Sequence, residues 1–273
     1  MKDLEDFMEY YGAVCGPFRY EARGQGPTLI LVPGLDGTAL LFYRQLPILA
    51  EAFRVITFPL PDDSRCTMGS LVEDLRRFIQ CVAEGDGGRP VVLCGESFGG
   101  ALSMSFALSH PRWVKGLVVV NSFPVIRERF QLYVAPPILK WVPWGAMRIV
   151  RRFTESRLHS PHALPEDLAE FHERLRLVGR NGYIRRLEIL QGYDIQERLP
   201  ELETPTLFLA GSLDQLVPSV DEARFMASRM PRAKVVVLEG YGHICMINHD
   251  FSLLEHIGPW LRGLQKSEAS TRP

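Results

Sequence analysis

The 273-residue sequence lacks a strong excess of either charge. It carries 31 Lys and Arg against 32 Asp and Glu, a formal net charge of -1. Proteins that bind nucleic acid usually show a clustered basic excess, so we expect no nucleic-acid partner. Hydrophobic residues (46%) and charged residues (23%) occur at levels ordinary for a globular protein. A chain of this length can bury roughly 70–75% of its unfolded surface, so its core requires no metal or disulfide.

The sequence also lacks a long uninterrupted hydrophobic run. Its most apolar stretch, residues 132–147, contains Lys140 and several prolines, which make it too short and too broken to cross a bilayer. The first eleven residues alternate acidic and apolar side chains and do not resemble a secretory signal. We therefore expect a cytoplasmic protein with no transmembrane segment. The oligomeric state is left open.

Cysteine is scarce. The five cysteines are widely spaced and form no C-x-x-C pair, which argues against a disulfide framework and against a zinc site. Cys94 lies in an apolar run, where a free thiol behaves as a small hydrophobic side chain. We interpret the cysteines as structural and reduced, and we expect neither a metal nor an organic cofactor. They are Cys15, Cys66, Cys81, Cys94 and Cys245.

Short apolar runs rich in β-branched residues recur along the chain. They do not alternate with polar residues, as is typical of strands covered on both faces. Helical patterns separate most of them, which predicts an α/β fold with a mostly parallel sheet and helices on both faces. The runs are Thr28–Val32, Phe53–Phe58, Pro90–Cys94, Val114–Val120, Thr206–Ala210 and Lys234–Leu238.

The clearest helical pattern is an apolar stripe at 3–4 spacing from Leu71 to Val82. Ser70 and Glu73 precede most of this stripe and predict a capping box at its start. Further helices are expected at Ala101–Leu108, Asp221–Met230 and Phe251–Leu261.

Residues 124–202 interrupt the alternation of predicted strands and helices because they contain no convincing strand. From 124 to 200 the chain carries 13 basic and 9 acidic residues, although the whole chain is slightly acidic. We interpret 124–202 as a helical cap inserted into a core domain formed by residues 1–123 and 203–273.

The strongest motif is Gly95-Glu96-Ser97-Phe98-Gly99, which matches G-x-S-x-G. It follows a predicted strand and opens a predicted helix, which is the setting of a nucleophile elbow. Such a turn would expose the Ser97 hydroxyl at the edge of the sheet and place a helix N-terminus beneath a reacting carbonyl group. A glycine-rich turn with an ordinary serine is the alternative.

A serine hydroxyl needs a base, and the chain order typical of this architecture is serine, acid, histidine. Asp214 follows the predicted strand 206–210, and His243 follows the strand 234–238. Because parallel strands end at the same edge of a sheet, we expect both side chains near Ser97 as a catalytic triad. The remaining histidines fit structural or exposed positions better.

Acyl transfer places negative charge on a carbonyl oxygen, which two fixed N–H groups can stabilise in an oxyanion hole. One N–H is expected from Phe98, the residue after the nucleophile. We assign the other to Leu35, in the glycine-containing loop Pro33–Thr38. Asp36 could hold this loop or cap a following helix.

Together these motifs resemble the α/β-hydrolase superfamily in order and spacing over nearly the whole chain. The pairing of P-G-L-D-G-T with G-E-S-F-G-G is similar to bacterial esterase-like proteins and to the hydrolase domain of plant phytyl ester synthase-like proteins. The resemblance implies ester or acyl chemistry. Pro33 stands where the usual loop has histidine, and Glu96 stands where histidine is frequent.

The sequence therefore predicts a serine hydrolase that cleaves small-molecule carboxylic esters through an acyl-enzyme on Ser97. An acyltransferase or thioesterase with the same triad, or a non-catalytic ligand receptor, are the alternatives. Trp141 and Trp144 in the cap could line an acyl pocket or merely attach the cap to the core. A basic stretch could bind an anion or form a solvated helix face. It contains Arg148, Arg151, Arg152 and Arg157.

Overall fold

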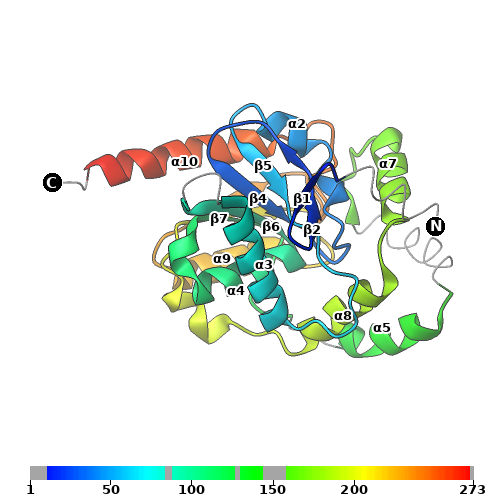
Figure 1. Cartoon of the computed structure of the whole chain (residues 1–273). Helices are drawn as coiled ribbons and strands as arrows, with labels where there is room; N and C mark the ends of the chain where they lie inside the picture. The colour runs from blue at the N-terminus through cyan, green and yellow to red at the C-terminus, as the bar shows by residue number, and fades with distance from the viewer. Residues whose placement is uncertain (1–10, 84–87, 127–129, 144–157, 271–273) are drawn as a thin grey trace.

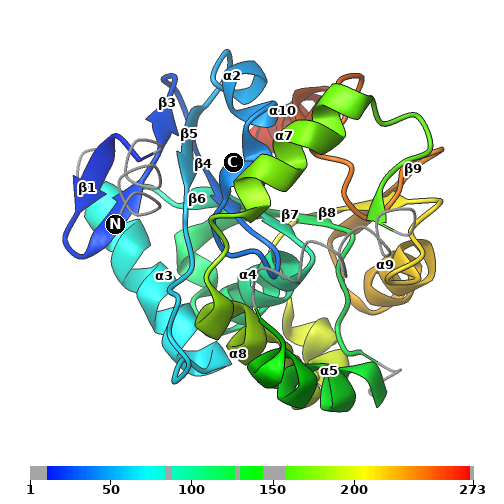
Figure 2. The same cartoon turned by 90° about the vertical axis from the view of Figure 1, so that its right-hand side faces the viewer.

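A computed structural model describes residues 11–83, 88–126, 130–143 and 158–270. A seven-stranded sheet runs through it in the order β3-β5-β4-β6-β7-β8-β9 (Figures 1 and 2). All neighbouring strands are parallel except β3, which pairs antiparallel with β5. The strands are β3 (Ala22–Arg23), β4 (Thr28–Val32), β5 (Arg54–Thr57), β6 (Val91–Glu96), β7 (Val114–Val120), β8 (Thr206–Gly211) and β9 (Ala233–Leu238).

Helices cover both faces of this sheet. On one face α3 (Met68–Ala83), α4 (Phe98–Ser109) and α9 (Ser219–Arg229) share a hydrophobic core with alternate strand residues. On the other face α2 (Gln45–Leu49) and α10 (Leu253–Ser270) form a second core (Figure 1). Because both faces are covered, β4, β6 and β8 are buried along their whole length, which explains their continuous apolar sequence.

The predicted α/β fold is confirmed, and each of the predicted strands is present within one or two residues of its expected bounds. A small antiparallel hairpin of β1 (Ala13–Cys15) and β2 (Phe18–Tyr20) was not expected from the sequence, and neither was the short edge strand β3. The short 3-10 helices η1 (Leu40–Phe42) and η3 (Pro111–Trp113) were also not expected.

Between β7 and β8 the described residues are mainly helical. They form α5 (Phe130–Trp141), α7 (Pro165–Leu175), α8 (Arg180–Gln191) and the 3-10 helix η5 (Gln196–Glu201). In Figure 2, α7 crosses in front of the upper part of the sheet, and α8 and α5 lie below the strands. This arrangement suits the expected cap, although the division of the chain into two domains stays a prediction.

The predicted capping box at Ser70 and Glu73 is wrong. Helix α3 begins at Met68, and the reciprocal bonds join Thr67 and Ser70: Thr67 N–H donates to Ser70 Oγ at 2.8 Å, and Ser70 N–H donates to Thr67 Oγ1 at 3.1 Å. Glu73 instead pairs with Arg76 one turn later. The Ser70 hydroxyl accepts the backbone N–H bond that a glutamate usually accepts in a capping box. The predicted box was therefore one turn too far along the chain.

The interpretation that all cysteines are reduced is also wrong. Cys15 of β1 and Cys81 of α3 form a disulfide, whereas Cys66, Cys94 and Cys245 are free and buried. The two partners are 66 residues apart in sequence and meet only because the β1–β2 hairpin packs on α3. The spacing of the cysteines in the sequence does not indicate which of them meet in the fold.

Replacing Cys15 with serine is expected to lower the free energy of unfolding by about 2–4 kcal/mol, because the cross-link then no longer restricts the unfolded chain. Urea unfolding without reductant measures this. Dithiothreitol should lower the free energy of unfolding of the wild type to that of the variant, and it should leave the value of the variant unchanged. A wild type that is insensitive to reductant would show that the pair does not form in solution.

Candidate active site

Ser97 sits on a sharp turn between β6 and α4. Its backbone has φ 52° and ψ -116°, a conformation that non-glycine residues rarely adopt. The turn needs glycine on both sides: a Cβ at Gly95 would lie 2.2 Å from the Gly99 carbonyl oxygen, and one at Gly99 would lie 2.1 Å from that of Val32. The strained serine and the crowded glycines match the expected nucleophile elbow.

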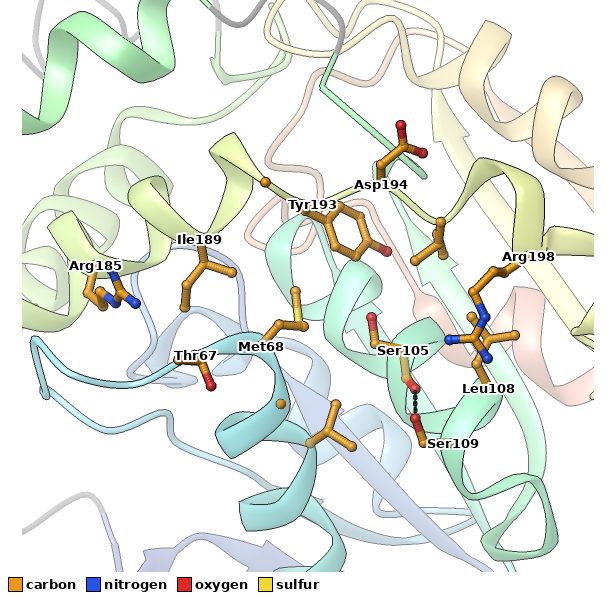
Figure 3. A pocket seen from close by; sticks show the side chains of 14 residues that line it. Thr67, Met68, Ser105, Leu108, Ser109, Arg185, Ile189, Tyr193, Asp194 and Arg198 are labelled. Atoms are coloured by element: carbon orange, nitrogen blue, oxygen red, sulfur yellow. Dashed lines mark hydrogen bonds between the residues drawn. The ribbon is translucent and has the colours of Figure 1, made fainter.

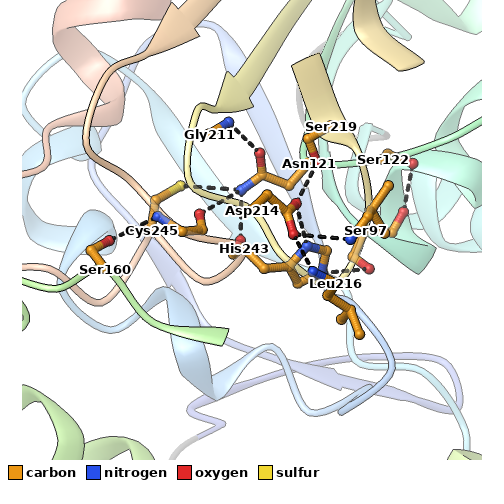
Figure 4. A network of polar contacts seen from close by, with 12 residues as sticks. Ser97, Asn121, Ser122, Ser160, Gly211, Asp214, Leu216, Ser219, His243 and Cys245 are labelled. Carbon is orange, nitrogen blue, oxygen red and sulfur yellow. Dashed lines mark hydrogen bonds and ion pairs between the residues drawn. The ribbon is translucent and has the colours of Figure 1, made fainter. Parts of the chain in front are cut away.

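The structure brings the three predicted triad residues together (Figure 4). The Nε2 atom of His243 lies 3.1 Å from Ser97 Oγ, and its Nδ1 atom lies 2.7 Å from Asp214 Oδ2. Each residue follows the carboxyl end of its strand, β6, β8 or β9, so the shared sheet edge creates the contact. With Nδ1–H donating to the carboxylate, Nε2 is free to accept the serine proton.

Burial and charge act in opposite directions on the His243–Asp214 pair. Burial lowers the pKa of His243, but the attraction of Asp214 and their hydrogen bond outweigh it, so the pKa rises above its ordinary 6.5. Burial raises the pKa of Asp214, and the bonds from His243, Ser219 and the Val217 N–H together bring it below its ordinary value. The pair therefore favours an aspartate anion beside a histidine that readily accepts a proton.

Two residues that the sequence analysis missed hold this pair in place. Asn121, at the end of β7, donates through Nδ2 to the His243 carbonyl at 2.6 Å and accepts the Gly211 N–H at 2.8 Å. It thereby ties the histidine loop to the end of β8 (Figure 4). Ser219 donates its hydroxyl to Asp214 Oδ2. The only sequence signal for Asn121 is a polar residue directly after an apolar strand.

The loop predicted to supply the second oxyanion donor lies beside the nucleophile. A Cβ built on Gly34 would be 3.6 Å from Ser97 Cβ. Among the described residues, neither the Leu35 N–H nor the Phe98 N–H donates to a backbone carbonyl in a turn or loop. Asp36 holds the loop, since its Oδ2 accepts both the N–H and the hydroxyl of Thr38.

Glu96, directly before the nucleophile, is a buried acid without a compensating bond. Its side chain is 4% exposed, and its Oε1 has no hydrogen-bond partner in the described part of the chain. Burial raises its pKa from 4.5 to about 8; nearby Asp36 and Asp214 add to the rise, and His243 opposes it. Glu96 is therefore mainly neutral at pH 7.

Glu96→Gln is expected to stabilise the protein more at pH 9 than at pH 5. In the unfolded chain Glu96 ionises near pH 4.5, but in the folded chain only near pH 8, so folding takes up a proton between these values. The wild type accordingly loses stability as the pH rises through this window, by an amount on the order of 3–5 kcal/mol. The glutamine variant has no such loss, and urea unfolding at several pH values measures the difference.

The exposed Glu73 offers the matched control. Its pKa is lowered, mainly by Arg76, so it is ionised in the folded and unfolded states throughout this pH range. Glu73→Gln should leave the pH dependence of stability unchanged. If Glu96→Gln and Glu73→Gln give parallel curves, Glu96 is not neutral in the folded protein.

The structure describes one of the two tryptophans that were expected near an acyl pocket. Trp141, at the end of α5, is 89% exposed, so it does not line an enclosed site there. Trp144 lies outside the described residues, as do the arginines of the basic stretch. A substrate contact at either tryptophan stays a prediction.

A separate pocket of about 460 Å³ lies between α3, α4, α8 and η5 (Figure 3). It includes no triad residue and neither expected oxyanion donor. Its two arginines already have partners: Arg185 bonds the Cys66 carbonyl and Glu188, and Arg198 pairs with Glu201. We assign it no ligand.

Within the described ranges, His, Cys, Asp and Glu side chains form no cluster of three or more suited to a metal ion. The same residues contain no helix whose length and hydropathy would let it cross a membrane.

The parallel sheet, the elbow and the Ser–His–Asp geometry define an enzyme of the α/β-hydrolase fold. The similarities to known proteins agree with this. The chain is 23% identical to a thermophilic esterase from Thermogutta terrifontis, whose structure superposes with a TM-score of 0.79 over 93% of this chain and 97% of that one.

The chain belongs to the family described as serine aminopeptidase, S33, which matches residues 66–250. It is 27% identical to a putative carbamate hydrolase, RutD, of Stutzerimonas stutzeri, over 84% of this chain and 91% of the relative. It is 26% identical to a pimeloyl-[acyl-carrier protein] methyl ester esterase of Aeromonas hydrophila, over 87% and 96% of the two chains. The superfamily resemblance seen in the sequence is thus confirmed.

Proposed function

We propose that this protein hydrolyses carboxylic esters of small molecules through an acyl-enzyme on Ser97. The observation that carries the proposal is that His243 bridges Ser97 and Asp214 at 3.1 and 2.7 Å at one sheet edge. This geometry gives the serine a base and the base a fixed tautomer. The esterase names among its relatives and structural neighbours support the same chemistry.

In the first half of the reaction, Ser97 Oγ bonds to the ester carbonyl carbon and its proton moves to His243 Nε2. The oxyanion that forms lies against the N–H groups of Leu35 and Phe98. The carbon–alkoxide bond then breaks, and the alcohol leaves with the proton from His243.

In the second half, water attacks the acyl-enzyme and gives a proton to His243. The bond from Ser97 Oγ to the acyl carbon breaks, the carboxylic acid departs, and His243 returns the proton to the serine. Asp214 stays ionised throughout and stabilises the imidazolium. These steps need no metal and no organic cofactor.

A panel of p-nitrophenyl esters of rising acyl length tests the proposal, together with a p-nitrophenyl carbamate and an amino-acid p-nitroanilide. We expect cleavage of short and medium esters. A fluorophosphonate should add one phosphonyl group, which peptide mass spectrometry locates on Ser97. If Ser97 is labelled but the protein cleaves only the carbamate or the anilide, the substrate is not a carboxylic ester. If there is neither turnover nor labelling, a non-catalytic receptor is favoured.

Two alternatives use the same triad and differ in the acyl donor or acceptor. An acyltransferase would pass the acyl group to an added long-chain alcohol in preference to water, which product analysis detects. A thioesterase would cleave acyl thioesters faster than the matching oxygen esters. Either result would replace ester hydrolysis as the main activity.

The cytoplasmic location expected from the sequence stays a prediction. The Cys15–Cys81 disulfide weighs against it, because reducing compartments rarely preserve such bonds.

A further inference from the structure

Arg186 is a fully buried cation that the proposed mechanism does not use. It lies on α8, between β7 and β8 in sequence, and its exposed fraction is 2%. Burying a guanidinium is costly unless its donors are satisfied. Burial does lower the pKa of Arg186, with Asp36 partly offsetting the effect. The groups that Arg186 binds must therefore compensate for its burial.

Among the described residues, Arg186 donates to three backbone carbonyls, two of them in the loop beside the nucleophile. Nε donates to the Leu35 carbonyl at 3.0 Å, and Nη2 donates to the Asp36 carbonyl at 3.1 Å. Nη1 donates to the Pro61 carbonyl at 3.1 Å, beyond β5. The planar guanidinium therefore fixes two successive peptide groups of the loop at once.

Gly37 makes room for this contact. Its φ is +73°, and a Cβ there would lie 2.5 Å from Arg186 Nη2. Its N–H donates to the Gly34 carbonyl at 3.2 Å. That carbonyl belongs to the peptide group that carries the Leu35 N–H, so the turn sets the direction of this N–H.

Each carbonyl oxygen from residue 34 to residue 38 accepts a hydrogen bond. The donors are the Gly37 N–H, Arg186 for residues 35 and 36, the Leu60 N–H and the Tyr11 hydroxyl. The loop has no helix or strand to hold it, so these bonds determine its path. Arg186 supplies two of them, from a residue about 150 positions later in sequence.

We propose that Arg186 is a positioning residue that holds the loop of residues 33–38 so that the Leu35 N–H points at the developing oxyanion. This inference rests on the proposed function, because it assigns Leu35 to the oxyanion hole. Arg186 touches no reacting atom and acts only through the loop. Its effect therefore belongs to the transition state and not to substrate binding.

The test compares Arg186→Met, Arg186→Lys and Arg185→Met. Methionine keeps much of the length and loses the donors, whereas lysine keeps the charge but has no planar fork. Arg185 is the matched control: it is next in the chain, lies on the same helix, and bonds the Cys66 carbonyl instead of the loop. Thermal unfolding and near-ultraviolet circular dichroism give the folded fraction of each variant.

For Arg186→Met we expect kcat on the best p-nitrophenyl ester to fall about 10–100-fold, with KM changed less than about threefold. A trifluoromethyl ketone, which forms a tetrahedral adduct with an active serine, should bind more weakly by the same factor. The kcat and the ketone affinity of Arg186→Lys should fall between those of the wild type and of Arg186→Met. Arg185→Met should match the wild type in both. Hydrogen exchange of a peptide covering residues 33–38 should speed up in Arg186→Met alone.

Unchanged kcat and unchanged ketone affinity in folded Arg186→Met would overturn the proposal. So would a loss of activity that only follows the folded fraction, with no change in ketone affinity per folded molecule. If the wild type cleaves no ester and binds no ketone, the proposed function has failed. Hydrogen exchange then still shows whether Arg186 orders the loop, and an unchanged rate there overturns that claim too.

Discussion

Ser97→Ala is expected to lower kcat for a p-nitrophenyl ester by about 10⁴–10⁶-fold, to little above the rate of the free ester in buffer. Removing the nucleophile of such a triad leaves only substrate binding and oxyanion stabilisation. The side chain is buried and small, so the fold should survive: Ser97 is 8% exposed, and its backbone N–H and carbonyl keep their bonds to Val120 and Ser122. Stopped-flow or plate-reader assays on purified variants measure the loss.

Ser109→Ala is a suitable control for this variant. Ser109 lies on the same helix, α4, and its hydroxyl donates back to the Ser105 carbonyl. Its replacement should change kcat less than twofold. If Ser97→Ala kept more than about one per cent of the activity while Ser109→Ala was normal, another residue would be the nucleophile and the acyl-enzyme proposal would fail.

Asp214→Asn is expected to lower kcat by about 10⁴-fold with little change in KM. The carboxylate accepts hydrogen bonds from His243, from Ser219, and from the N–H groups of Leu216 and Val217. An amide at this position can present its NH₂ group to His243, which favours the wrong imidazole tautomer and leaves the imidazolium without its counter-charge. Steady-state kinetics at several pH values separate these losses from a change in substrate binding.

The pH profile adds a second readout for the same variant. Only neutral His243 can accept the serine proton, so kcat/KM should rise with pH, with an apparent pKa above the ordinary 6.5 in the wild type. Because Asp214 is the main cause of that raised pKa, the rising limb should move to lower pH in Asp214→Asn.

Asp250 provides the control, since it forms a more exposed pair with another histidine, His162, at 3.3 Å. Asp250→Asn should leave both the rate and the pH profile unchanged. An unshifted limb in Asp214→Asn would mean that another group sets the ionisation of the base.

The sheet and the three converging side chains could be predicted because both depend on patterns within short segments of the sequence. Strands covered on both faces need continuous apolar runs, and a serine at an elbow needs glycines two positions away on each side. Asp214 and His243 could be found because parallel strands deliver the residues after them to one edge. These signals lie within a few residues of the features that they specify.

The rest depends on contacts between distant parts of the chain. Asn121 bonds residue 211 and residue 243, and Arg186 bonds residues 35 and 36. Neither looks different in sequence from an ordinary polar loop residue or helix arginine. The Cys15–Cys81 pair likewise requires a hairpin to fold onto α3, and we found no local sequence pattern that predicts this hairpin.

The order of the triad along the chain also bears on biosynthesis. The serine turn at residue 97 and the aspartate at 214 leave the ribosome well before the histidine at 243, whose loop is held by Asn121 and by the N–H of Gly242 on Ser160. A growing chain therefore contains Ser97 before it contains the histidine that we propose as its proton acceptor. The hydroxyl of Ser97 and the imidazole of His243 can therefore meet only after residue 243 has been synthesised and its loop has folded against β7.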